Sequence, residues 1–61
     1  MGTARRITIY RRRDGDFGYR VQAGNWRTIE TSEEGFLRKA SILKRLDRRY
    51  RNAEIVDLTL P

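Results

Sequence analysis

The 61-residue chain predicts a small α+β domain: an antiparallel three- to four-stranded β-meander with one α-helix packed on one face, in the order βββαβ. Between residues 7 and 30, apolar and polar side chains alternate, and turn residues interrupt the alternation twice. From residue 36 the apolar spacing changes to that of a helix, and residues 54–60 alternate again. These patterns predict three strands, a helix and a last strand.

The strands follow from residue type as well as from spacing. Residues 7–11 are rich in β-branched side chains, which suit a half-buried strand. Asp14-Gly15 then provides a turn, because Gly takes a positive φ without a steric penalty. A second alternating run covers residues 17–23, Gly24-Asn25 is the next two-residue turn, and residues 26–30 form the third strand.

The helix has a clear apolar stripe but two possible starts. Thr31 with Glu34 resembles a capping box, whereas a loop ending at Gly35 would place the first helical residue near Leu37. Lys39 lies within the apolar stripe, and we expect its amine to reach out of it. The stripe that should face the sheet consists of Phe36, Ala40, Ile42, Leu43, Leu46 and Tyr50.

Length and composition limit the class of protein. We expect a flexible basic arm over residues 1–6 and a single domain over 7–61, whose thin core favours dimerisation. The sequence has no cysteine and no histidine, which excludes disulfides and Cys/His zinc sites and suits a cytoplasmic location. Its short apolar runs predict no membrane span.

Catalysis and metal binding are not expected. The close carboxylates are Asp14 with Asp16 and Glu33 with Glu34, which are too few for a calcium loop and lack a cleft that would shift a pKa. We therefore predict no enzyme, no cofactor, no metal and no small-molecule substrate.

The net charge of +6 is concentrated in one segment. Residues 38–51 carry seven basic side chains and one acid, Asp47, so the rest of the chain sums to zero. A basic surface of this kind is typical of proteins that bind nucleic acid, but it also fits a solvated helix exterior or a surface for an acidic protein partner. The candidate nucleic-acid-binding residues are Arg38, Lys44, Arg45, Arg48, Arg49, Arg51, Arg5 and Arg6.

The outer face of the sheet is a second candidate surface. Aromatic and basic side chains alternate there with the residues that should face the helix, and this mixture suits either base stacking or, as we favour, a homodimer interface. Arg11 to Arg13 fit a charged edge strand or a nucleic-acid-binding arm. The predicted interface consists of Tyr10, Arg12, Arg20, Gln22 and Trp26.

Several short motifs resemble the YegP-like small-domain family, a domain of unknown function. They are a hairpin Asp14-Gly15, Ala23-Gly24-Asn25, Gly35-Phe36, Lys39-Ala40 and the closing run 53–57. The resemblance implies an α+β fold that occurs in pairs, here as a homodimer, and implies no enzyme. Trp26 stands where that family prefers Gly, and Leu37 where it prefers Ser or Thr.

A weaker likeness is to the three-stranded sheet plus helix of plant AP2 domains and of the arm-binding domains of phage integrases. It implies that the outer face of the sheet reads the major groove of DNA.

Overall fold

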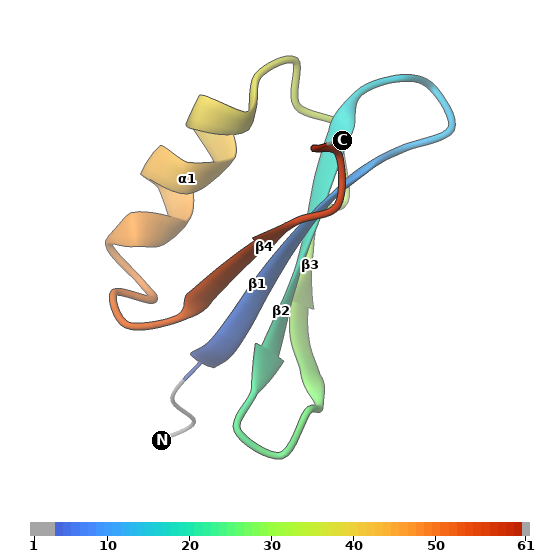
Figure 1. Cartoon of the computed structure of the whole chain (residues 1–61). Helices are drawn as coiled ribbons and strands as arrows, with labels where there is room; N and C mark the ends of the chain where they lie inside the picture. The colour runs from blue at the N-terminus through green and yellow to red at the C-terminus, as the bar shows by residue number, and fades with distance from the viewer. Residues whose placement is uncertain (1–3, 61) are drawn as a thin grey trace.

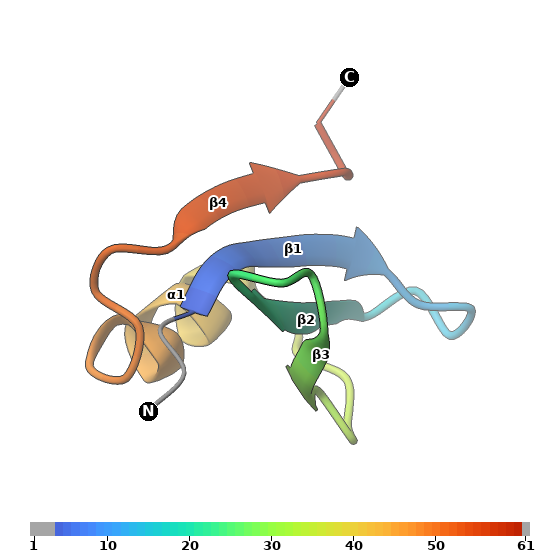
Figure 2. The ribbon, with the colours of Figure 1, turned by 90° about the horizontal axis from the view of Figure 1, so that it is seen from below.

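The computed structural model describes residues 4–60, which form one four-stranded sheet with one helix on one side of it (Figures 1 and 2). The strand order across the sheet is β3-β2-β1-β4. The elements in chain order are β1 (Ala4–Arg11), β2 (Phe17–Ala23), β3 (Thr28–Thr31), α1 (Lys39–Asp47) and β4 (Glu54–Asp57).

The α+β class and the βββαβ order are confirmed, but the sheet is mixed rather than wholly antiparallel. β1 pairs with β2, and β2 with β3, in antiparallel fashion, whereas β4 runs parallel to β1 with Ile7 opposite Ile55. A parallel pairing needs a crossover of a dozen or more residues, and residues 32–53, which contain α1, provide it. The alternation of side chains carries no information on strand direction.

The core lies between α1 and one face of the sheet. On that face Ile7 pairs with Val21 and Ile9 with Tyr19, and all four side chains are buried. From the helix, Ile42 is 0% exposed and Leu46 is 1% exposed, so these two residues contribute the main apolar contact. The remaining buried apolar residue is Ala4, with Phe17, Phe36, Tyr50 and Ala53 packed at the margin.

The predicted helical stripe was too wide and began too early. Leu43 is 38% exposed and Ala40 is exposed, and the helix residues that the sheet buries are Ile42 and Leu46. Phe36 is not helical: its backbone exchanges two hydrogen bonds with Phe17, of 2.8 and 2.9 Å, and so extends the sheet. The helix consequently begins at Lys39, which agrees with the loop alternative and not with a capping box at Thr31.

The strand at the amino end is longer than predicted. We assigned residues 1–6 to an arm, but Ala4–Arg6 belong to β1, and Ala4 is buried. Residues 1–3 of that arm lie outside the described residues. Ala4 pairs with Ala23 and Arg6 with Gln22, so Arg5 is the extra residue of a β-bulge.

Both hairpins use a three-residue loop of the same design. In the first, Gly15 donates its N–H to Arg12 O at 3.0 Å and has a φ of 92°. In the second, Trp26 donates its N–H to Ala23 O at 2.9 Å and has a φ of 66°. This is a β-turn followed by a left-handed residue, a position that favours Gly. The expected two-residue turn at Gly24-Asn25 was therefore wrong, and β3 begins at Thr28 instead of Trp26.

Truncation of the two neighbouring helix leucines tests this packing. Leu46→Ala should lower the free energy of unfolding by about 2 to 5 kcal/mol, because it leaves a cavity under the helix. The matched change Leu43→Ala should cost about 1 kcal/mol or less, since that side chain is already partly in water. Urea denaturation compares the two. Equal losses would contradict the rotational setting of α1 on the sheet.

Candidate nucleic-acid interface

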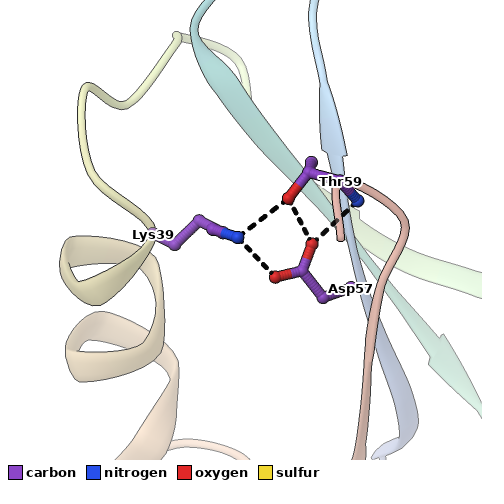
Figure 3. A network of polar contacts seen from close by, with 3 residues as sticks. All are labelled: Lys39, Asp57 and Thr59. Carbon is purple, nitrogen blue, oxygen red and sulfur yellow. Dashed lines mark hydrogen bonds and ion pairs between the residues drawn. The ribbon is translucent and has the colours of Figure 1, made fainter. Parts of the chain in front are cut away.

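The amino end of α1 is fixed to the edge strand β4 by a charged contact. Lys39 Nζ lies 2.8 Å from Asp57 Oδ2 and donates a second hydrogen bond to Thr59 Oγ1 at 2.9 Å (Figure 3). Thr59 in turn donates its hydroxyl and its backbone N–H to Asp57 Oδ1. The expectation that Lys39 reaches out of the apolar stripe is therefore met. Because the first turn of the helix has no acid and Lys39 is a cation at the positive end of the helix dipole, the carboxylate of Asp57 compensates its charge.

The carboxyl end of α1 is fixed to the other edge of the sheet by one carboxylate. Glu30 of β3 accepts hydrogen bonds from Tyr19 Oη at 2.6 Å and from Tyr50 Oη at 2.7 Å. Arg49 Nη1 lies 3.1 Å from the same carboxylate. Glu30 thus joins β3, β2 and the turn that follows the helix.

These contacts shift the pKa values of their partners. Burial acts to raise the pKa of Glu30, but hydrogen bonds from Tyr19 and Tyr50 and the charge of Arg49 outweigh it, so the pKa lies below its ordinary value. Burial, with the hydrogen bond to Glu30, raises the pKa of Tyr19 to about 12. The hydrogen bond to Glu30 and burial raise the pKa of Tyr50 as well. Glu30 thus holds the carboxyl end of the helix, as Asp57 holds its amino end.

The predicted nucleic-acid-binding residues at 38–51, except Arg49, take no part in these two contacts. Fewer of them than expected belong to the helix itself. Lys44 and Arg45 are in α1, Arg48 is its C-cap, and the carboxyl end is the favourable end for cations. Arg38 is the N-cap, and Arg49 and Arg51 follow the helix. Apart from Arg49, none of these side chains forms an ion pair within residues 4–60, and all of them are exposed.

The outer face of the sheet is more polar than the predicted dimer interface implies. Tyr10 lies across Gly18, where an added Cβ would stand 2.8 Å from its ring, so the tyrosine is half-buried. Arg12 belongs to the hairpin and pairs with Asp14 at 3.6 Å. Arg20 is exposed on this face and Gln22 is half-buried.

Trp26 and the first two arginines come together at one place. The guanidinium carbons of Arg5 and Arg6 lie 4.5 and 4.6 Å from the centre of the Trp26 ring. Gln22 Nε2 donates a hydrogen bond of 3.1 Å to Trp26 O. Arg6 is also held by Glu54, with Nε 3.0 Å from Oε1. The structure therefore unites residues that the sequence assigned to two surfaces.

The topology gathers much of the charge at one end of the sheet. β1 begins, α1 ends and the β2–β3 loop turns at the same end, as Figure 1 shows. A groove at this end is lined by Ile7, Tyr50, Arg51 and Ile55, which places the turn after the helix beside the start of β1. We call this region the basic end; its cations are Arg5, Arg6, Arg27, Arg48, Arg49 and Arg51.

Sequence reasoning missed the side chains that fix the two ends of the helix to the sheet. Glu30, Asp57 and Thr59 were read as ordinary strand residues. Glu30 faces the helix because a register shift separates its pairing with Val21 from that of Thr28 with Gln22, and this irregularity leaves Ile29 half exposed. The alternation rule cannot place side chains beyond such a shift.

Within residues 4–60, no three His, Cys, Asp or Glu side chains are grouped as metal ligands, and no helix has the length and apolar character to cross a membrane. Comparison with protein-family models, with curated proteins and with solved structures finds no match for this chain. The resemblance to the YegP-like family stays a prediction.

Acid denaturation tests the contact at the amino end of the helix. Hydrogen bonds from Lys39 and then Thr59 lower the pKa of Asp57 from 3.8 to about 2. The folded state therefore binds this proton less readily than the unfolded state, so stability from this group is present above pH 3.8 and is lost as pH falls towards 2.

We expect Asp57→Asn and Lys39→Met each to flatten this part of the pH dependence and to lower stability at neutral pH. Chemical denaturation at a series of pH values measures both effects. An unchanged slope between pH 4 and pH 2 in both variants would contradict the role of this contact.

Proposed function

We propose that this protein is a small non-enzymatic module that binds nucleic acid, with phosphates contacting the outer surface and carboxyl end of α1. The observation that carries the proposal is that Lys44, Arg45 and Arg48 are exposed and have no acidic partner within residues 4–60. Cations left in this state attract phosphates, whereas paired cations are largely neutralised.

The proposal is supported by where the acidic side chains form their ion pairs. Within residues 4–60, four of the Lys and Arg side chains form ion pairs, and two of the acidic partners, Glu30 and Asp57, hold the two ends of the helix to the sheet. No acid pairs with a side chain on the outer surface of the helix in the described part of the chain. Twelve of the 14 Lys and Arg residues of the chain are arginines, whose guanidinium groups form two parallel hydrogen bonds to a phosphate.

Arg49 has a different role in this proposal. Its hydrogen bonds to Glu30 hold the turn after the helix, and a reversed charge there would place two carboxylates together. Arg49 therefore positions the surface, and the direct contacts fall to Lys44, Arg45, Arg48 and Arg51.

An acidic protein is the alternative partner for the same charge, and a homodimer remains a further proposal. The outer sheet face supports nucleic acid better than a symmetric apolar interface, because Arg20 and Gln22 lie on it and Tyr10 is engaged with Gly18. Sedimentation equilibrium of the free protein tests dimerisation directly.

Salt dependence is the test of phosphate binding. If four to six phosphates contact the protein, the logarithm of the association constant should fall with the logarithm of salt concentration with a slope of roughly −3 to −5. Fluorescence anisotropy with labelled duplex DNA, single-stranded DNA and RNA measures it. Binding to none of these more tightly than about 100 μM at low salt would refute the proposal and favour the acidic protein.

A pair of double variants locates the surface. Arg45→Gln with Arg48→Gln should weaken binding and reduce the magnitude of the salt slope by about 2, since each residue releases one counterion. The control, Arg11→Gln with Arg13→Gln, removes the same charge beside the first hairpin, at the other end of the sheet, and should have a smaller effect. Equal losses in the two proteins would show that net charge matters and the helix surface does not.

A further inference from the structure

We propose that Trp26, with Arg5 and Arg6, is a stacking site for a base of single-stranded nucleic acid, a role that rests on the proposed function and specifies its ligand. Trp26 is 45% exposed, and it is the one tryptophan in the chain. Two guanidinium groups lie within 4.6 Å of the centre of its ring. An exposed aromatic ring bordered by cations is the combination that binds a base and its phosphate together.

The backbone at Trp26 is the first argument, because it is strained although the ring lies outside the buried core. Trp26 holds the left-handed conformation, with a φ of 66°, at the loop position that Gly15 fills in the other hairpin. A residue with a Cβ is disfavoured in this conformation, because its Cβ approaches the following carbonyl oxygen. The ring is not part of the buried core, so core packing does not offset this strain. Strain that the core does not require points to a use outside the fold.

The second argument is that Arg6 is fixed by an ion pair, whereas Arg5 is not. Arg6 donates to Glu54 and is half-buried, so it is fixed against the ring. Arg5 is exposed at the β-bulge and has no acidic partner within residues 4–60. Its guanidinium is able to leave the ring for a phosphate, and a base then takes its place on the aromatic surface.

The ligand class follows from what the ring requires. A base offers its flat surface only when it is unstacked, as it is in single strands and not within a duplex. Arg20 and Gln22 lie on the outer face of the sheet, away from the helix. Gln22 contacts the backbone of Trp26, so the two side chains extend the polar surface near the ring.

The position of the site connects it with the phosphate contacts on the helix. Trp26 belongs to the β2–β3 loop, which lies at the basic end together with the carboxyl end of α1 (Figure 1). A single strand that passes around this end would contact Arg48 and Arg51 on one side of the sheet and Trp26 on the other. Duplex DNA, which is stiff, would not follow that path.

The fluorescence of the wild-type protein tests this site without a label, because Trp26 is the sole tryptophan. Titration with oligothymidine should quench its emission through stacking. Inorganic polyphosphate, which has charge but no bases, should bind with the predicted salt dependence and quench less.

Trp26→Gly separates binding from folding, because Gly relieves the left-handed backbone. The variant should be at least as stable as the wild type in urea, yet bind oligothymidine about 10-fold more weakly and polyphosphate equally well. Trp26→Phe keeps an aromatic ring and should retain most of the affinity for oligothymidine.

The outcomes distinguish this site from the proposed function. If both ligands bind with the expected salt dependence, but oligothymidine neither quenches Trp26 nor loses affinity in Trp26→Gly, the stacking site is refuted and phosphate binding stands. If neither ligand binds, both proposals are refuted. A Trp26→Gly protein that is destabilised would show that the ring serves the fold, which also refutes the stacking site.

Discussion

Glu30 is the residue on which the arrangement of this small domain most depends. Its carboxylate accepts hydrogen bonds from the hydroxyls of Tyr19 and Tyr50 and from the guanidinium of Arg49. These bonds fix the turn after the helix to the edge strand β3. Apolar contact alone would leave the helix loosely oriented, because it buries two residues, Ile42 and Leu46, against the sheet. At the opposite end, Lys39 and Asp57 fix the helix to the other edge strand. A thin core is thus supplemented by two ionic contacts.

This arrangement determines which charges remain on the surface. The two contacts engage Glu30 and Asp57 at the ends of the helix, and the exposed Lys44, Arg45 and Arg48 form no ion pair within residues 4–60. The mixed topology adds to this effect. Because β4 runs parallel to β1, the turn after the helix comes to lie beside the start of β1, and the strained Trp26 loop lies at the same end of the sheet. Charge and an exposed aromatic ring are therefore combined at the basic end.

The sequence was sufficient for the fold class because alternation and helical spacing report directly on burial. Three features were beyond it. The direction of β4 depends on the crossover as a whole, and not on residues 54–57. The bulge at Arg5 and the register shift beside Ile29 reverse the side-chain alternation, so Arg5 and Glu30 could not be placed. The role of Trp26 depends on a loop type that the dipeptide Gly24-Asn25 does not specify, although the unusual Trp in a turn was a signal.

We propose that nucleic acid binds at the basic end, where α1 finishes and β1 starts. Chemical-shift mapping by nuclear magnetic resonance, with a short single-stranded oligonucleotide, tests it most directly. We expect the amides of residues 48–51 and the indole of Trp26 to shift together and to saturate at the same ligand concentration. The hairpin at residues 12–16, which lies at the other end of the sheet, should stay unchanged (Figure 1). Shifts that centre on that hairpin, with residues 48–51 and Trp26 unmoved, would contradict the account.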